Sequence, residues 1–270
     1  MRRPSLESGR LLLWVFSLVV VAFLLAPIFV VIGVSFNKSA LFDFPPSEWS
    51  LRWYQALIAS REWREAFWLS LWLAVGVTTA SLLLGVPAAY ALARSRFRGR
   101  AVVSFFLVSP VIVPVIVLAL GFYFLFAPLG LIGRPMGLLL AHTVLALPVV
   151  IIIVEAAFLR ADVSVELAAR ACGASFLRMF WHVSLPSVRP ALMSAGAFAF
   201  LTSFDEVVLA LFLGGPQAVT LPKRIWEAVK FEVDPSLTAV SSLLVALTIV
   251  ALLVAEFGRR RLAHAFAKGS

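Results

Sequence analysis

Two adjacent carboxylates, Asp205 and Glu206, lie within an otherwise apolar run of this 270-residue chain. If a helix begins at Pro190, Asp205 lies about 22 Å along it, which is inside the outer half of a bilayer core roughly 30 Å thick. A carboxylate there costs about 2.5 kcal/mol or more unless it faces protein or water. Neighbouring helical residues point in different directions, so one acid, favoured as Asp205, is expected to line a polar pathway that suits a cation. The alternatives are a structural contact to another subunit, or a helix break near Ser203 that leaves both acids in an interfacial loop.

A second set of residues that could act on another molecule lies in the polar stretch 160–190. Asp162 or Ser164 is placed to cap a short helix over residues 165–172, and Gly173 suits the left-handed residue that ends such a helix. The stretch offers a ridge of small residues followed by aromatic ones, namely Ala168, Ala169, Cys172, Phe176 and Phe180. Such a ridge fits a groove of another protein, but an amphipathic helix lying on a membrane surface is an equal alternative. The residues alone leave both interpretations open.

The elements that must position these residues are long apolar runs. Hydrophobic residues make up 62% of the chain and charged residues 14%, which lies outside the range of soluble domains. Runs of about 20 apolar residues predict membrane-spanning helices. We therefore predict an all-α integral membrane protein of one domain, residues 1–270, with six spans near 11–36, 66–93, 101–127, 137–159, 190–212 and 235–256. The polar loop 160–189 separates the fourth span from the fifth.

Proline and glycine mark irregular places within these spans. Gly85 and Pro87 are expected to interrupt the second span. Pro110 and Pro114 lie about one turn apart in the third span and predict a kink there. Between the fifth and sixth spans, residues 222–231 predict a short amphipathic helix that lies on the membrane surface.

The net charge of +9 is distributed unevenly between the loops. With six spans both termini share one side, and the Lys and Arg residues on that side number fifteen, against eight on the other. The positive-inside rule then places the termini, the turn 94–100 and the loop 160–189 in the cytoplasm. This distribution accounts for the basic character without a nucleic-acid partner. Near the cytoplasmic end of the fourth span, Glu155 is expected to pair with Arg160 or Arg94.

The chain lacks the residue patterns of several function classes. One cysteine, Cys172, and three scattered histidines exclude a disulfide framework and a zinc cluster, and His142 is interpreted as an ordinary polar residue. No G-x-x-x-x-G-K-[ST] run occurs, so we expect no ATP site of this kind in the chain, and no metal or cofactor. An intramembrane enzyme would need a Ser/His pair, an H-E-x-x-H pair or two Asp in separate spans. A transporter acting alone is disfavoured because no inverted repeat is found.

The polar loop resembles the EAA loop of permease subunits of binding-protein-dependent ABC importers, which reads E-A-A-x-x-x-G and later L-P. The residues in register are Ala168, Ala169, Gly173, Leu185 and Pro186. Leu167 stands where the family has its Glu, and Glu166 lies one residue earlier. Leu167 in place of this Glu puts in question the charged contact between the loop and the ATPase, more than the docking of the loop itself. By this resemblance the residues that dock the ATPase are Glu166, Leu167, Ala168, Ala169, Gly173, Phe176, Leu185 and Pro186.

Other segments are similar to the spermidine/putrescine branch of that family, at the position of its second permease subunit. They are the run SFDEVV at 203–208 and the run TLP at 220–222. Pro110 and Pro114 resemble the paired prolines of the family as a whole. Relatives that import 2-aminoethylphosphonate, ferric iron, sulfate or thiamine share much of this architecture. These cargoes therefore stand as the alternative to polyamines.

The resemblance implies a type I ABC importer permease fold in a bacterial inner membrane, surrounded by lipid. The chain would form half of the pathway together with a second permease subunit. A periplasmic or lipid-anchored binding protein would deliver the substrate. A dimer of cytoplasmic ATPase subunits would bind ATP and Mg, grip the two EAA loops and switch the pathway between inward- and outward-facing states. The chain itself would be a transport subunit and not an enzyme.

Overall fold

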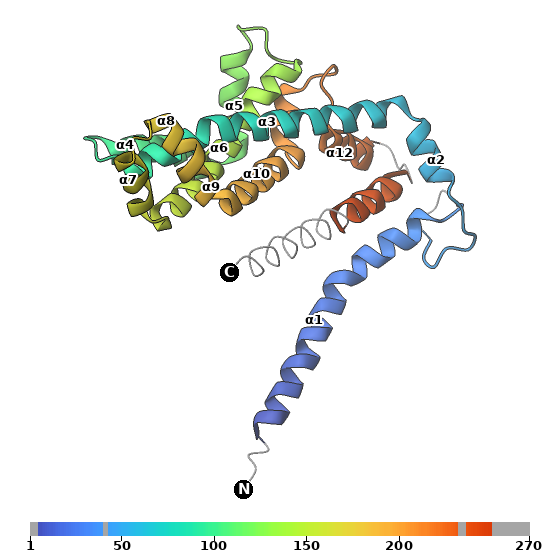
Figure 1. Ribbon diagram of the computed structural model, residues 1–270. Helices are drawn as coiled ribbons and strands as arrows, with labels where there is room; N and C mark the ends of the chain where they lie inside the picture. Colours follow the sequence, from blue (N-terminus) through green and yellow to red (C-terminus); the bar gives the residue numbers. More distant parts are fainter. Residues whose placement is uncertain (1–4, 40–42, 232–235, 250–270) are drawn as a thin grey trace. The chain divides into compact units, whose positions relative to one another are not determined.

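The computed structural model describes residues 5–39, 43–231 and 236–249, and within these ranges the regular structure is helical (Figure 1). The chain forms two compact units. The first combines the chain up to Arg61 with the chain from Glu227 onward, and the second is Glu62–Trp226. Every residue that the sequence singles out for docking or for the pathway lies in the second unit.

The first unit is built on helix α1 (Ser5–Ser35), helix α2 (Arg52–Ala59) and the helix Ser236–Ile249. From Arg10 to Ser35 the mean hydropathy of α1 reaches 3.1, and none of its most apolar stretch is buried. A helix that is apolar on all sides is suited to a lipid environment. The hydroxyl of Tyr54 joins the three helices, because it lies 2.7 Å from Ser35 Oγ and 3.1 Å from Ser242 Oγ.

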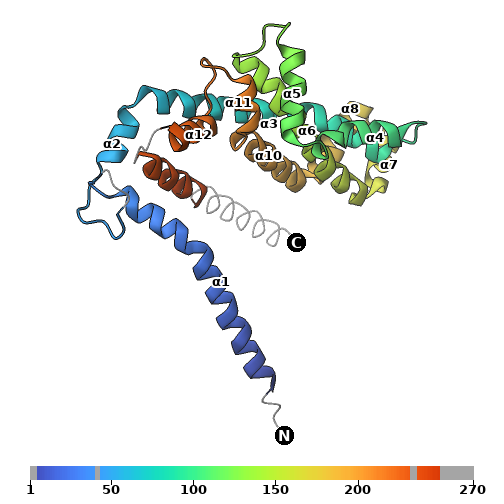
Figure 2. The same cartoon turned by 180° about the vertical axis from the view of Figure 1, so that it is seen from behind.

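The remaining helices lie in the second unit or cross its ends. In chain order they are α3 (Arg61–Arg94), α4 (Arg100–Val108), the 3-10 helix η1 (Ser109–Val111), α5 (Val115–Phe126), α6 (Pro135–Arg160), α7 (Val163–Ala171), α8 (Phe176–Met179), the π-helix η2 (Phe180–Ser184), α9 (Leu185–Ser187), α10 (Arg189–Phe204), α11 (Val208–Leu213) and α12 (Leu221–Phe231). Figures 1 and 2 both show α10 lying along α6.

Small residues allow α3, α6 and α10 to approach one another closely. Fully buried alanines line the contact, namely Ala89, Ala146, Ala195 and Ala199. Gly85 of α3 lies so close to α6 that a Cβ atom there would be 2.8 Å from Val150 Cγ1. Lipid provides no hydrophobic force between helices, so close packing of this kind is what holds them together. A second apolar cluster joins α3 and α6 to α5 and α11.

Three described helices are long and apolar enough to cross a membrane: Arg10–Ser35, Arg61–Arg94 and Pro135–Arg160. The count becomes four if Arg100–Val111 and Val115–Phe126 are one span, and these two meet at a bend of 100°. The kink that Pro110 and Pro114 predict is therefore present. Pro114 has no amide hydrogen with which to continue the helix, and α5 begins directly after it.

Two expectations about continuity are wrong. Gly85 and Pro87 do not interrupt the second span, because α3 runs through both, with Ala89 fully buried in the core beside them. The fifth span is not one helix, because α10 ends at Phe204 and α11 begins at Val208. In α3, packing against neighbouring helices overrides the local signal of Gly85 and Pro87.

The amphipathic helix expected at residues 222–231 is present as α12. Its start is held against α3, because Ser70 Oγ accepts a hydrogen bond from the Leu221 amide at 2.7 Å and Arg224 lies 3.0 Å from Glu62. Of the sixth expected span the structure describes Ser236–Ile249. The rest of that span, residues 235 and 250–256, lies outside the described residues.

Replacing Gly85 with Ala tests the packing of α3 on α6. The new methyl group would meet Val150 Cγ1 at 2.8 Å, so we expect the free energy of unfolding to fall by about 1 kcal/mol despite the better helix preference of Ala. At Gly121 of α5 a Cβ atom would meet nothing within 4 Å, and the same change is expected to be neutral or stabilising. Heating the purified variants and measuring the surviving fraction by size exclusion compares them. Equal losses at both glycines would contradict this packing.

Candidate functional site

The loop between α6 and α10, residues 161–188, begins with a capped helix. The Asp162 side chain accepts a hydrogen bond from the Ser164 amide at 2.9 Å, which caps α7 and lowers the pKa of this carboxyl below its ordinary value. Gly173 follows the helix with a φ of 86°, a left-handed conformation that glycine adopts without strain. The capping and the ending therefore confirm the sequence prediction. The helix covers Val163–Ala171 and so begins slightly earlier than expected.

The second half of this loop contains an unusual turn. Ser175 caps α8 by accepting a hydrogen bond from the Arg178 amide at 3.4 Å. The chain then continues as the π-helix η2, a geometry that is rare and often found at functional sites. The buried Ser184 hydroxyl donates to Met179 Sδ at 3.0 Å. Leu185 and Pro186 follow in α9, where they are half-buried at the junction with α10.

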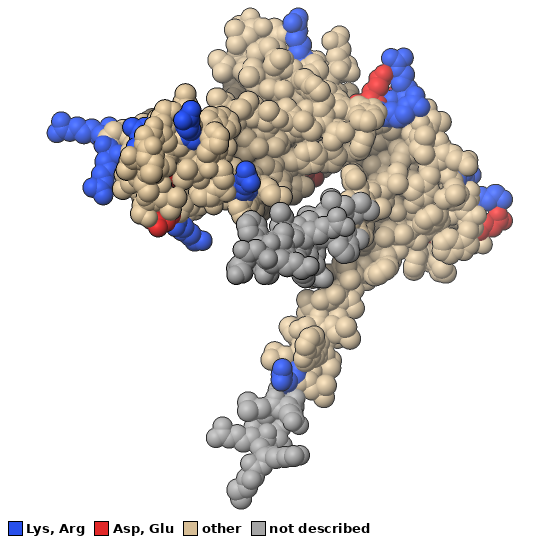
Figure 3. All heavy atoms as spheres, viewed as in Figure 1, with Lys and Arg blue, Asp and Glu red and all other residues tan. Residues whose placement is uncertain are grey.

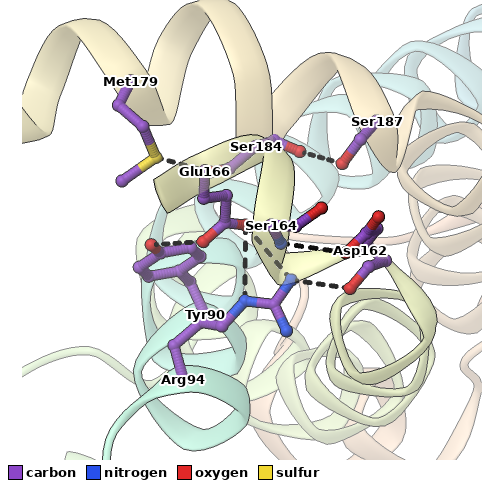
Figure 4. Close-up of polar contacts among 9 residues, drawn as sticks. Tyr90, Arg94, Asp162, Ser164, Glu166, Met179, Ser184 and Ser187 are labelled. Carbon is purple, nitrogen blue, oxygen red and sulfur yellow. Dashed lines mark hydrogen bonds and ion pairs between the residues drawn. The ribbon is translucent and has the colours of Figure 1, made fainter. Parts of the chain in front are cut away.

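Glu166 is the only buried residue of α7. Its Oε1 atom lies 3.1 Å from Arg94 Nη2 and 3.3 Å from Arg94 Nε (Figure 4). Its other oxygen, Oε2, accepts a hydrogen bond from the Tyr90 hydroxyl at 3.2 Å. Arg94 also donates to the Ala161 carbonyl at 3.1 Å, so it holds the chain that enters α7 as well. We call Tyr90, Arg94 and Glu166 the Glu166 clamp.

Three phenylalanines hold the ring of Tyr90. Its centroid lies 5.2 Å from that of Phe158 in α6, 5.9 Å from that of Phe176 in α8 and 5.1 Å from that of Phe180 in η2. All three pairs are edge-to-face, which is favourable for aromatic rings. The sequence analysis did not assign this role to Tyr90 or Arg94. The available signal was their spacing of four residues, which places them on one face of α3.

The other residues of α7 are exposed or half-buried. Leu167 is 64% exposed, although it directly follows the buried Glu166. It belongs to an exposed apolar set that we call the outer face of the loop: Val163, Val165, Leu167, Phe176, Leu177 and Trp181. Ala168 and Gly173 are also exposed, and Ala169 is half-buried. Figure 3 shows Lys and Arg side chains gathered at the end of this unit that carries α4 and α7. An apolar patch with a polar rim is typical of a protein interaction site.

The two acids differ in their surroundings at the break between α10 and α11. Glu206 Oε1 accepts hydrogen bonds from the amides of Val208 and Leu209 at 2.7 and 3.0 Å, and so it caps α11. Asp205 is exposed at the end of α10. The helix break considered from the sequence is therefore present, at residues 205–207. Of the two acids, Asp205 is the one whose carboxylate is exposed.

A buried polar pair holds α10 to α6 just before this break. His142 Nδ1 lies 3.0 Å from Ser203 Oγ, and both residues are buried. Nothing in the sequence pattern pairs His142 with a residue 61 positions away. The contact fixes the end of α10 and with it the place where Asp205 emerges.

Glu155 pairs with neither of the arginines expected for it. Its Oε1 atom lies 3.2 Å from Nη2 of Arg100, the first residue of α4. This pairing arises because α4 packs against α6, while the guanidinium of Arg94 is engaged by Glu166.

Neither site is built as a metal centre. Within residues 5–39, 43–231 and 236–249, no group of three or more His, Cys, Asp or Glu side chains is placed to hold a metal ion. Cys172 is exposed at the end of α7. The chemistry that the two sites offer is binding: an apolar surface for another protein at the loop, and an exposed carboxylate for a cation at the helix break.

Comparisons with known proteins relate this chain to transport proteins. Residues 81–268 match the family described as binding-protein-dependent transport system inner membrane component. The putrescine transport system permease protein PotI of Escherichia coli (strain K12) is 35% identical over 229 residues, which cover 82% of this chain and 81% of that protein. The spermidine/putrescine transport system permease protein PotC of the same strain is 33% identical over 248 residues, which cover 92% of this chain and 94% of that protein.

A solved structure shares the fold. It is the crystal structure of a bacterial ABC transporter involved in the import of the acidic polysaccharide alginate. One of its chains matches with a TM-score of 0.78, covering 95% of this chain and 99% of that chain. At 19% sequence identity this likeness shows the fold alone.

Substitutions of Glu206 separate its capping role from its charge. Glu206→Ala removes the acceptor of both amide hydrogen bonds, so we expect a loss of about 1 kcal/mol in the free energy of unfolding. Glu206→Gln keeps a side-chain oxygen at the same position and is expected to remain within a few tenths of a kcal/mol of the natural protein. Thermal unfolding of the two purified variants measures the difference. A Gln variant as unstable as the Ala variant would show that the carboxylate acts through its charge.

Proposed function

The chain belongs to the family of binding-protein-dependent transport system inner membrane components, and we propose that it forms half of the translocation pathway of an ABC importer for polyamines. It is a transport subunit and not an enzyme, and the ATPase is a separate subunit. The observation that carries the proposal is the α6–α10 loop, where the apolar outer face is exposed and the only buried residue of α7 is Glu166.

The outer face of the loop is suited to a groove in an ATPase subunit. Leu167, Phe176 and the neighbouring apolar side chains are exposed, and such patches are typical of docking sites. Because Leu167 occupies the outward position, we propose that its contact with the ATPase is apolar. Among the eight residues that the resemblance implies for docking, Leu167, Ala168, Gly173 and Phe176 would form the contact. Glu166, Ala169, Leu185 and Pro186 would support it from below.

The remaining architecture follows from this docking. We propose six spans, formed by α1, α3, the bent pair α4–α5, α6, the broken pair α10–α11 and the segment 235–256, within one permease domain. Both termini and the α6–α10 loop lie in the cytoplasm, as the positive-inside rule indicates. A second permease subunit completes the pathway, and a periplasmic or lipid-anchored binding protein delivers the cargo. The dimeric ATPase binds ATP and Mg, so this chain requires no cofactor.

Three observations support a polyamine as the cargo. Relatives with one-third identity over most of the chain, PotI and PotC, are named for putrescine and spermidine transport. The exposed carboxylate of Asp205 lies where α10 breaks, and a carboxylate in a low-dielectric pathway favours a cation. Phe204 and Phe200 stack one turn apart beside it, with centroids 5.5 Å apart, and aromatic faces also attract cations. The alternative cargoes are 2-aminoethylphosphonate, ferric iron, sulfate and thiamine.

Asp205→Asn removes the proposed cation contact without changing the size of the side chain. We expect uptake of labelled putrescine into proteoliposomes containing the complete importer to fall about tenfold, because a charged hydrogen bond is lost. Glu206→Gln, which removes the neighbouring charge, serves as the matched control and should retain most of the uptake. Unchanged putrescine uptake in Asp205→Asn would contradict this assignment. If the importer takes up one of the alternative cargoes and not putrescine, the proposal that its cargo is a polyamine is contradicted.

Leu167→Asp tests the docking of the ATPase. A buried charge without a partner is costly at an interface, so we expect the amount of ATPase that co-purifies with the permease to fall about tenfold. Leu129→Asp is the matched control, because Leu129 is 63% exposed and lies between α5 and α6, at the other end of α6 from the loop. Equal ATPase recovery with both variants would show that the outer face of the loop does not dock it.

A further inference from the structure

Helix α7 buries one side chain in the second unit, and it also contacts α8 and η2. Of its nine residues only Glu166 is buried. A helix of this length has little stability in isolation. The position of α7, and of the part of the outer face that it carries, therefore depends in part on the groups that hold Glu166.

The groups that hold Glu166 belong to α3. Tyr90 and Arg94 contact both oxygens of its carboxylate, as Figure 4 shows for the three side chains between the two helices. The side chain of Arg94 is 12% exposed and that of Glu166 is 9% exposed. At this burial an ion pair is screened little by salt. The clamp is thus a specific contact between α7 and α3, in addition to the peptide chain that joins α7 to α6.

The part of α3 that carries the clamp is firmly packed. Ala89 and Leu92, which flank Tyr90, are 0% and 1% exposed in the cluster shared with α6 and α10. A helix with α3's 34 residues is about 50 Å long. A displacement of α7 that passes through the clamp therefore acts on a long, packed helix rather than on a loose connection.

We propose that Tyr90 and Arg94 are positioning residues for transport, which make α7 and α3 move together when an ATPase acts on the outer face of the loop. This inference rests on the proposed docking of the ATPase. Glu166 is then an internal link, with its carboxylate turned away from the ATPase. Without the clamp α7 remains attached to α6 through the chain, but its motion no longer acts directly on α3.

Hydrogen–deuterium exchange in the complete transporter tests this coupling without knowledge of the cargo. The two permeases, the ATPase and the binding protein are placed together in lipid nanodiscs, and exchange is measured with and without ATP and vanadate. In the natural transporter the nucleotide should change exchange both in α7 and in the end of α3 near Arg94. In Arg94→Gln and Glu166→Gln the response of α7 should remain, while that of α3 falls about fivefold or more.

Further variants separate this coupling from a general loss of structure. Tyr90→Phe removes one hydroxyl and keeps the packed ring, so it should weaken the α3 response in the same way even if an arginine variant fails to assemble. The double variant R94Q/E166Q should behave like either single variant, because both changes break one interaction. Arg100→Gln is the matched control, since it breaks the ion pair with Glu155 at 3.2 Å and leaves α7 untouched. It should respond like the natural transporter.

Three results would overturn the inference. A natural α3 response in both Arg94→Gln and Tyr90→Phe would show that the clamp does not transmit motion. An equal loss in Arg100→Gln would show that any disturbance near the loop has this effect. If the natural permease retains no ATPase, or its α7 does not respond to nucleotide, the proposed docking itself fails and the inference fails with it.

Discussion

The α6–α10 loop depends on one buried ion pair, Glu166 with Arg94. Removing two charges from water is costly unless hydrogen bonds replace the lost solvation. Here both oxygens of the carboxylate are bonded, and the guanidinium also bonds the Ala161 carbonyl. This pair turns the Glu166 side chain inward, while Val163, Val165 and Leu167 of the same helix stay exposed. The carboxylate of Glu166 thus pairs within the chain and does not face another protein, and Leu167 next to it is exposed.

A few polar contacts also position the other helices of the second unit. α3 is held at one end by the Glu166 clamp and near its other end by the hydrogen bond of Ser70 to α12. Between these points small residues bring it against α6 and α10. The buried contact of His142 with Ser203 then holds α10 to α6 up to the break that exposes Asp205. The proposed ATPase site and the proposed cation site are therefore built on one framework of three helices.

Features set by local chemistry could be predicted from the sequence. Asp162, Gly173 and Ser175 cap or end short helices through the backbone next to them. Pro114 directly precedes the start of α5, at the bend that the paired prolines predict. Features set by distant contacts could not be predicted. The sequence does not show which arginine pairs with Glu155. The packing of α4 on α6 brings Arg100 to Glu155, while Arg94 pairs with Glu166. The continuity of α3 through Pro87 depends in the same way on neighbouring helices. The burial of Glu166 beside the exposed Leu167 follows from the direction in which α7 faces, which its short sequence does not determine.

Cys172 allows the most direct test of the central claim, that the α6–α10 loop docks an ATPase. It is the single cysteine of the chain and is exposed at the end of α7. The measurement is the rate at which a maleimide labels Cys172 in membranes that contain the permease pair, with and without the ATPase subunit. If the loop docks the ATPase, labelling should be much slower when the ATPase is present. Equal rates, with the ATPase shown to be bound, would contradict the account.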